Sequence, residues 1–232
     1  MVVAPRISSC TGIARHFEPI KITSEMMLPT SDFHIPNHYK SDVRTILIPH
    51  GLIIDRIASL ARSIRADNPT ETLHLVCVLK GGFHFFNDLQ NALKSCHEST
   101  SNNVPFTFDF VRAKSYAGTS TTGEVKISGL DTSKLLGRHV VLCEDIVDTG
   151  RTMALLAPLL EESKPKSLRV ASLLEKRRED SDIKFVADYV GFSVPDEFVV
   201  GFCLDYNDAF RDLDHICCIS PAGIERFKDG VI

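Results

Sequence analysis

The sequence predicts an α/β fold in which a parallel, twisted sheet is flanked by helices. Short apolar runs rich in β-branched residues recur along the chain, and stretches with helical periodicity lie between them. Strands that alternate with helices are typical of parallel sheets, because each parallel connection needs a crossover element that covers the sheet. The chain has 232 residues and is 44% hydrophobic, which is enough for one buried core.

The expected elements follow in chain order. Residues 1–32 carry no clear pattern, so we expect an N-terminal tail of uncertain role there, followed by a single domain over residues 33–232. A short strand at residues 45–48 precedes an amphipathic helix over residues 52–65, whose apolar side chains recur every three or four positions. Further elements are expected as strands at residues 73–79, 106–112, 139–143, 168–174 and 185–190, and as helices from Phe83 and Met153.

The most informative stretch joins a predicted strand to a predicted helix. Residues 139–143 are apolar, and two adjacent carboxylates, Glu144 and Asp145, follow them. A small, hydroxyl-rich turn over residues 148–152 then leads into the helix. An open α/β sheet binds its ligand at strand ends of this kind. The N–H groups of the turn and the helix dipole suit a phosphate, and the paired carboxylates suit hydroxyl groups or a metal ion.

Two other polar segments follow predicted strands. Lys80, Gly81 and Gly82 come after the strand at residues 73–79, and glycines at such a turn let the backbone approach an anion closely. The same turn is also compatible with a simple corner between strand and helix. A long polar segment over residues 113–123, rich in Gly, Ser and Thr, indicates either a lid or a long hairpin.

Composition excludes several classes of protein. The net charge of −4 leaves no basic surface for nucleic acid. No apolar run approaches the roughly 20 residues that a membrane span requires, and Pro5 and Arg6 interrupt any N-terminal signal sequence. The 7 cysteines are odd in number and include no C-x-x-C pair, which favours reduced, buried thiols in a cytoplasmic protein.

The stretch that joins the central strand to its helix resembles the phosphoribosyl-pyrophosphate signature of the type I phosphoribosyltransferases. That signature is an apolar strand, two acids, two apolar residues and then Asp-Thr-Gly-x-Thr, and residues 139–152 fill each class of position. Three later segments resemble the hypoxanthine-guanine branch, animal-type enzymes above all: Phe-Val-Val-Gly at 198–201, Leu-Asp-Tyr-Asn at 204–207 and Phe-Arg-Asp-Leu at 210–213. With earlier matches at 35–39 and 48–51, the resemblance covers about residues 33–223.

The resemblance implies a fold, a reaction and partners. The fold is that of the type I enzymes, with a small hood made from the N-terminal segment and the residues after about 190. The implied reaction is purine salvage: a 5-phosphoribosyl group passes from phosphoribosyl pyrophosphate to N9 of hypoxanthine or guanine, giving IMP or GMP and pyrophosphate, with Mg²⁺ as cofactor. We expect a cytoplasmic homodimer or homotetramer that binds phosphoribosyl pyrophosphate and 6-oxopurines, and neither nucleic acid nor a membrane.

The resemblance also gives individual residues expected roles. Asp148 is the expected catalytic residue and contacts purine N7. The 5-phosphate and ribose are expected at Glu144, Asp145, Asp148, Thr149, Gly150, Arg151 and Thr152. Pyrophosphate is expected at Lys80, Gly81 and Arg211, the purine at Lys176, Phe198, Val199 and Asp205, and magnesium at Glu144, Asp145 and Asp205. Ser115 and Tyr116 are expected to close a lid, and the bond before Lys80 can be a cis peptide in this family.

Departures from the family pattern are few. Many relatives carry Lys where this chain has Arg151, which leaves the strength of 5-phosphate binding open. We interpret Arg177 and Arg178, which follow Lys176, as a solvated strand end.

The alternative function is a catalytically weak or regulatory protein with the same fold, but such a protein would be expected to lack the catalytic acid or the purine lysine. A dinucleotide-binding oxidoreductase would need a G-x-G-x-x-G motif, which residues 80–83 do not form.

Overall fold

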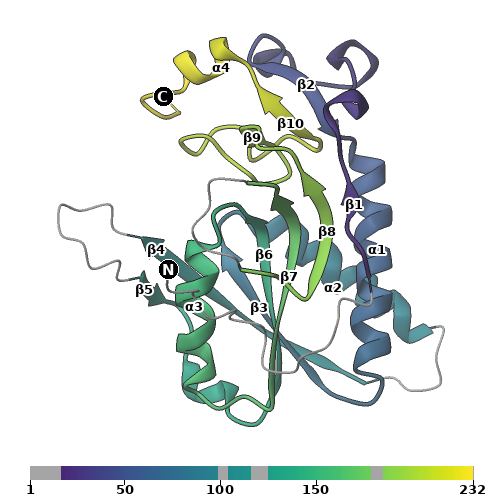
Figure 1. Cartoon of the computed structure of the whole chain (residues 1–232), viewed down its shortest axis with the longest axis vertical. Coiled ribbons are helices and arrows are strands. Elements are labelled where there is room, and N and C mark those ends of the chain that lie inside the picture. Colours follow the sequence, from purple (N-terminus) through teal and green to yellow (C-terminus); the bar gives the residue numbers. More distant parts are fainter. Residues whose placement is uncertain (1–16, 99–103, 116–124, 179–184, 232) are drawn as a thin grey trace, which may run out of the picture.

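A seven-stranded sheet and a smaller three-stranded sheet organise the fold (Figure 1). The structure, a computed structural model, describes residues 17–98, 104–115, 125–178 and 185–231. The larger sheet, the body, contains β1 (Ile20–Lys21), β3 (Leu73–Leu79), β4 (Phe106–Ser115), β5 (Val125–Ser128), β6 (His139–Val147), β7 (Ser167–Lys176) and β8 (Tyr189–Val194). The smaller sheet, the hood, contains β2 (Val43–Ile48), β9 (Val199–Val200) and β10 (Ile216–Ile219). The helices are α1 (His50–Asp67), α2 (Phe83–Glu98), α3 (Arg151–Glu161) and α4 (Pro221–Arg226), with 3-10 turns at η1 (Ser24–Met26), η2 (Thr30–Asp32), η3 (Asn37–Tyr39) and η4 (Thr132–Leu135).

Strand order places the functional turns on one edge of the body. The order is β1-β8-β7-β6-β3-β4-β5, and the pairing is parallel except between β4 and β5. Parallel strands all finish on the same side of their sheet, so the turns after β3, β6 and β7 are neighbours, and Figure 1 shows them beneath the hood. The predicted fold class is confirmed.

Helices cover both faces of the body, which explains why its central strands are apolar throughout. Successive side chains of a strand point to opposite faces. On one face, Leu75 packs in a core with side chains of α1 and α2, such as Leu60 and Phe86. On the other face, Val76 packs in a second core with Leu156 of α3. The two cores together hold β3 and β6 rigidly and fix where their carboxyl ends lie.

Part of the expected N-terminal tail belongs to the packed body. β1 pairs in parallel with β8 through Ile20 and Phe192, and Leu28 forms a β-bridge with Ile46 of the hood. The side chain of Ile22 is only 1% exposed. Residues 17–32 therefore add an edge strand to the body and connect it to the hood, which corrects the expectation of a tail for this segment. Residues 1–16 lie outside the described part of the chain.

One predicted strand begins too early, and the strands predicted for β2, β4, β6 and β7 are too short. The strand expected at residues 185–190 is β8, which begins only at Tyr189. Residues 185–188 precede it without strand structure, although Asp188 makes two hydrogen bonds with the backbone of Val170 in β7 (2.8 and 2.9 Å). β6 and β7 continue past the predicted ends, since their ladder runs on to the pair Val147 and Glu175. The apolar pattern did not indicate these longer strands, because the residues at their ends are polar.

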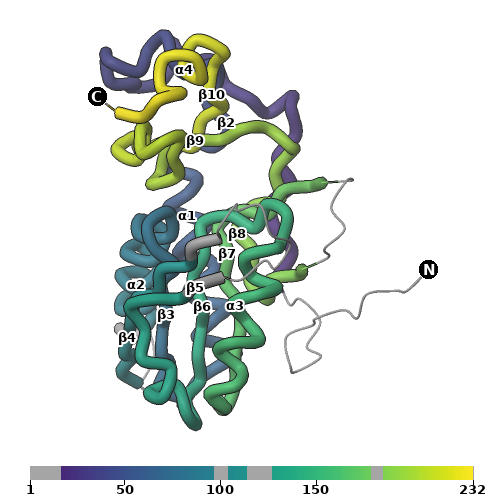
Figure 2. The backbone as a smooth tube through the Cα atoms, turned by 90° about the vertical axis from the view of Figure 1, so that its left-hand side faces the viewer, coloured from purple at the N-terminus to yellow at the C-terminus, as the bar shows by residue number. Residues whose placement is uncertain are grey.

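The hood has a small core of its own. The Tyr39 ring stacks on Phe210 with 4.5 Å between centroids, and Phe227 packs edge-on against Phe210 at 5.0 Å. Figure 2 shows the hood standing above the body, on the side where the parallel strands end.

Of the cysteines that the structure describes, none is in a disulfide and five of six are buried. None of the described helices combines the length and apolarity that crossing a membrane would need.

Candidate active site

A cavity of about 250 Å³ opens at the end of β6, lined by Val78 and residues 144–153. Gly150, one of the lining residues, has φ of 79°, a left-handed conformation that favours glycine, and α3 begins at the next residue. The first N–H groups of an α-helix have no intrahelical partners, so the start of α3 suits a phosphate. The structure thus brings Thr149, Gly150, Arg151 and Thr152 together around one cavity.

Glu144 and Asp145 form a carboxylate pair at the edge of this cavity. Glu144 is 7% exposed, and its Oε2 is buried with no hydrogen-bond partner. Burial, and then the negative charge of Asp145, raise the pKa of Glu144 well above its ordinary value. Two close carboxylates in such a place need a compensating cation to stay ionised. Magnesium prefers oxygen ligands from one or two carboxylates plus substrate phosphates, so this pair fits the ion.

The Lys80-Gly81 turn packs directly against Asp145. A side-chain carbon added at Gly81 would lie 1.7 Å from Asp145 Oδ2, so only glycine leaves room for that carboxylate. The peptide bond between Leu79 and Lys80 is cis, as the family resemblance suggested. The turn therefore meets the carboxylate pair at the carboxyl ends of the neighbouring strands β3 and β6.

Lys80 and Arg211, the expected pyrophosphate ligands, share an acidic partner that the sequence did not indicate. Lys80 Nζ lies 3.0 Å and Arg211 Nη2 lies 2.9 Å from the same Oδ1 of Asp208. Their hydrogen bonds lower the pKa of Asp208. Two cations from distant parts of the chain thus converge on one carboxylate oxygen, as they would on an anionic ligand.

Asp205 lies with these cations and apart from the carboxylate pair. Its Oδ1 is 2.7 Å from Arg211 Nη2, and its Oδ2 accepts a hydrogen bond from the N–H of Asp208 at 2.8 Å. Among the described residues, no three acidic, histidine or cysteine side chains are grouped so as to hold a metal ion. The structure therefore does not bring Asp205 to Glu144 and Asp145.

The expected purine ligands Lys176 and Asp148 are in direct contact. Lys176 Nζ lies 3.2 Å from Asp148 Oδ2, and the lysine side chain is only 8% exposed. Arg178 also contacts Asp148, at 3.0 Å, and Asp196 lies near both cations. The interpretation of Arg177 and Arg178 as a solvated strand end is wrong, because Arg177 also donates hydrogen bonds to the backbone carbonyls of Ser193 and Ile22.

Phe198 and Val199 occupy the lower edge of the hood. The Phe198 side chain is 47% exposed and packs edge-on against Tyr206, with 5.4 Å between ring centroids. A large exposed aromatic face next to a polar site is available for stacking. Val199 is buried and pairs with Cys218 in the hood sheet, which fixes the backbone beside Phe198.

The expected lid lies largely outside the described part of the chain. Ser115 ends β4 and its backbone pairs with Val125 of β5. Tyr116 and the rest of the segment to residue 124 lie outside the described residues. Lid closure over the site stays a prediction.

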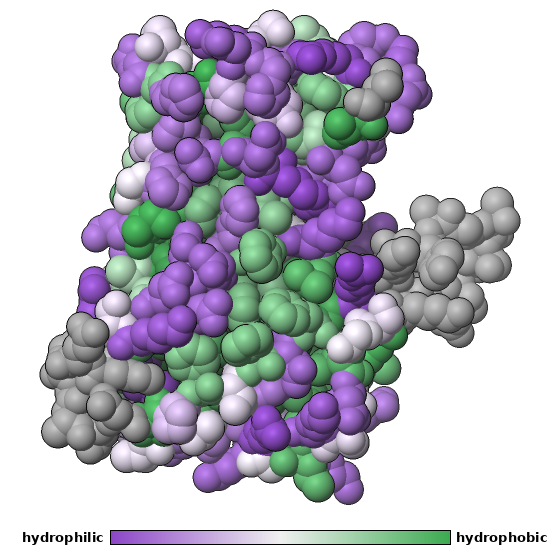
Figure 3. Space-filling view, turned by 180° about the vertical axis from the view of Figure 1, so that it is seen from behind, coloured by the Kyte–Doolittle hydropathy of each residue, from purple (hydrophilic) through white to green (hydrophobic). Residues whose placement is uncertain are grey.

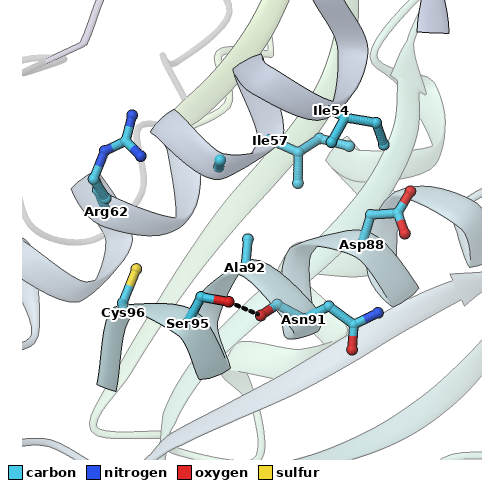
Figure 4. A pocket seen from close by; sticks show the side chains of 9 residues that line it. Ile54, Ile57, Arg62, Asp88, Asn91, Ala92, Ser95 and Cys96 are labelled. Atoms are coloured by element: carbon cyan, nitrogen blue, oxygen red, sulfur yellow. Dashed lines mark hydrogen bonds between the residues drawn. The ribbon is translucent and has the colours of Figure 1, made fainter. Parts of the chain in front are cut away.

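Two further cavities contain none of the predicted site residues. One, of about 350 Å³, lies between α1 and α2; Figure 4 shows Ile54 and Ile57 on one helix facing Ala92 on the other, with Ser95 donating to the Asn91 carbonyl. The other, of about 610 Å³, lies at the amino edge of the body around Arg138. Size alone therefore does not identify the active site; the convergence of charged groups does.

Comparisons with known proteins agree with this geometry. The family model described as "Phosphoribosyl transferase domain" matches residues 44–207. The hypoxanthine-guanine phosphoribosyltransferases of Bos taurus and Homo sapiens are 47% and 46% identical to the chain over 197 residues, which are 84% of this chain and 90% of each relative.

A solved structure extends the similarity to the fold. The crystal structure of hypoxanthine-guanine phosphoribosyltransferase from Schistosoma mansoni in complex with IMP superposes with a TM-score of 0.77 and 33% sequence identity. The match covers 91% of this chain and 100% of that one, so it includes the hood as well as the body. On sequence and structure alike, this chain belongs to the phosphoribosyltransferase family, within its hypoxanthine-guanine branch.

Proposed function

We propose that this protein makes IMP or GMP from hypoxanthine or guanine and phosphoribosyl pyrophosphate, and releases pyrophosphate. The observation that carries the base assignment is the contact of 3.2 Å between Lys176 Nζ and Asp148 Oδ2. The 6-oxygen and N7 are adjacent on one edge of a 6-oxopurine. A lysine and a carboxylate that touch each other match that edge, with Lys176 donating to the oxygen and Asp148 facing N7.

Asp148 acts as the general base of this reaction. As N9 of the purine bonds to C1 of the ribose, a proton on N7 must leave, and a carboxylate within hydrogen-bond reach accepts it. Lys176 strengthens the same step, because its positive charge stabilises negative charge on the 6-oxygen. Phe198 stacks on the ring, and Val199 presents its backbone to the far edge.

The sugar and its leaving group occupy the opposite side of the site. The turn from Thr149 to Thr152 binds the 5-phosphate. Glu144 and Asp145 would hold the ribose hydroxyls and a magnesium ion, and Asp205 would join a second magnesium ion through water. Magnesium supplies charge neutralisation at the leaving pyrophosphate. In the structure, Lys80 Nζ and Arg211 Nη2 lie 3.0 and 2.9 Å from Oδ1 of Asp208. When pyrophosphate binds, its oxygens replace this carboxylate as the partner of both cations.

One assay tests the base assignment. Hypoxanthine, guanine, xanthine and adenine are each supplied with phosphoribosyl pyrophosphate and Mg²⁺, and kcat/KM is measured. Lys176 carries only donors, and the 6-amino group of adenine is a donor too, so adenine is rejected. Lys176→Ala loses one charge-assisted hydrogen bond of about 1.5–3 kcal/mol, so its hypoxanthine-to-adenine ratio should fall by roughly 10- to 150-fold.

A matched control and two contrary outcomes make the assay decisive. Lys94→Ala removes an exposed lysine of α2 whose ammonium donates to Asn91, outside the proposed site, and should keep the wild-type ratio. Equal use of adenine and hypoxanthine by the wild type, or an unchanged ratio in Lys176→Ala, would contradict the base pocket described above. Turnover with none of the bases would favour the regulatory alternative.

The assembly and location of the protein stay predictions. Large apolar side chains are exposed at Ile54 (37%), Phe83 (46%) and Phe108 (48%). Figure 3, the view from behind, shows apolar residues gathered over the middle of that face below the hood. Exposed apolar surface of this kind supports the expected homodimer or homotetramer, since subunit contacts cover such surface. The reduced cysteines support a cytoplasmic location.

A further inference from the structure

Four charged side chains meet where the body approaches the hood. Asp148 comes from the turn after β6, Lys176 ends β7, Arg178 follows two residues later, and Asp196 lies between β8 and β9. Lys176 and Arg178 lie 3.2 and 3.0 Å from Asp148, and 3.6 and 3.5 Å from Asp196. Each cation thus lies between the same two carboxylates.

The two oxygens of Asp148 have different partners. Lys176 Nζ contacts Oδ2, whereas Arg178 Nη1 donates to Oδ1 at 3.0 Å. A carboxylate held at both oxygens cannot rotate about its Cβ–Cγ bond without losing a contact. Exposed fractions of 8% for Lys176, 24% for Arg178 and 41% for Asp148 place these contacts in a partly desolvated region, where they are screened less than surface ion pairs.

We propose that Arg178 is a positioning residue for the proton transfer from purine N7: it holds Oδ1 of Asp148 so that the carboxylate keeps its orientation toward N7 when Lys176 turns to the 6-oxygen. This inference rests on the function proposed above. Binding of a 6-oxopurine draws the Lys176 ammonium away from Oδ2, which leaves Arg178 as the cation that still orients Asp148. Asp196 in turn holds Arg178 in place.

Arg177 provides a matched control. It is the adjacent arginine and is also partly buried, but its guanidinium donates to the carbonyls of Ser193 in β8 and of Ile22, the residue after β1, and not to Asp148. Removing either arginine changes the net charge of this strand end equally. Only removal of Arg178 frees Oδ1 of Asp148. The pair of variants therefore separates the positioning of Asp148 from a general effect of positive charge.

The test is steady-state kinetics of the full chain with hypoxanthine, phosphoribosyl pyrophosphate and Mg²⁺, in wild type, Arg178→Gln, Arg178→Lys and Arg177→Gln. Misplacing a reacting group by an ångström can cost about a hundredfold, so Arg178→Gln should lose roughly 10- to 100-fold in kcat. KM for phosphoribosyl pyrophosphate should stay within about twofold, because the group acts in the transition state. The hypoxanthine-to-adenine ratio should also hold, because Lys176 is intact.

The other variants complete the test. Arg178→Lys keeps a donor and should recover most of kcat, and Arg177→Gln should keep kcat within about twofold. Thermal unfolding of each variant, followed by circular dichroism, verifies that kcat refers to folded protein. A wild-type kcat in Arg178→Gln, or an equal loss in Arg177→Gln, would overturn the inference alone. If the wild type turned over neither hypoxanthine nor guanine, the proposed function would be overturned, and this inference with it.

Discussion

Replacement of Gly81 by alanine should greatly lower activity while leaving the fold intact. The added methyl group would lie 1.7 Å from Oδ2 and 2.7 Å from Cγ of Asp145. Real side-chain carbons do not approach an oxygen closer than about 3 Å, so the carboxylate must move by more than ~1 Å. The clash falls on the far end of a side chain, which can rotate away at little cost. Stability is therefore spared, and the position of Asp145 is lost.

The magnitude follows from what Asp145 does in the proposed site. Its carboxylate holds a ribose hydroxyl and magnesium, and a displacement of ~1 Å in such a group costs about a hundredfold in rate. Gly81→Ala should therefore lower kcat/KM for phosphoribosyl pyrophosphate by roughly 100-fold, which is about 2.7 kcal/mol of transition-state stabilisation. Its melting temperature should fall by no more than ~2 °C, equivalent to less than 1 kcal/mol.

Two other glycines, Gly82 beside Gly81 and Gly51 in α1, serve as controls for this prediction. In Gly82→Ala the new carbon would lie 2.6 Å from the backbone oxygen of Val78, which cannot rotate away, so about 1–3 kcal/mol of stability and several degrees of melting temperature should be lost. Gly51→Ala meets nothing within 4 Å and should preserve both properties. Wild-type kcat/KM in Gly81→Ala, or a melting temperature lowered as far as in Gly82→Ala, would refute the reasoning.

Two other predictions concern magnesium and pH. Because Glu144 and Asp145 are close carboxylates, turnover should stop in excess chelator and return with Mg²⁺; full turnover in chelator would contradict the metal assignment. Burial, and then Arg138, lower the pKa of His74, so the folded state keeps it neutral while the unfolded chain takes up a proton below about pH 6.5. Stability should fall as pH drops from about 7 to 5. Urea unfolding at both pH values should show a stability that depends less on pH in His74→Gln than in the wild type, and an equal dependence in the two proteins would contradict this prediction.

Local sequence was sufficient for the central part of the site. The strand, the two acids, the Gly150 turn and the helix that follows are contiguous, so one stretch of sequence carries the whole phosphate-binding unit. The parallel fold class was also predictable, because strands buried on both faces are apolar throughout and alternate with helices. The resemblance of this stretch to the type I signature implied the family, and the resemblance of the segments between 198 and 213 implied the purine salvage activity; the comparisons support both.

Contacts between distant segments could not be predicted from the sequence. Lys80 and its partner Asp208 are 128 positions apart, and β1 joins β8 across more than half of the chain. β1 has only two residues, too few for any periodic pattern to indicate a strand. An arginine after a strand has the same local sequence signal whether its side chain faces water or a carboxylate, and for this reason Arg178 was misinterpreted.

The sequence by itself determined which chemical groups this protein carries and the local structure that presents each of them. Hydrophobic periodicity, turn residues and helix caps depend on residues that are close in sequence, so they can be recognised in the sequence itself. Only the tertiary structure decided which of those groups meet. The contact between Arg178 and Asp148 exists because β6 and β7 are parallel neighbours in register, and the burial of both faces of the sheet under helices fixes that register.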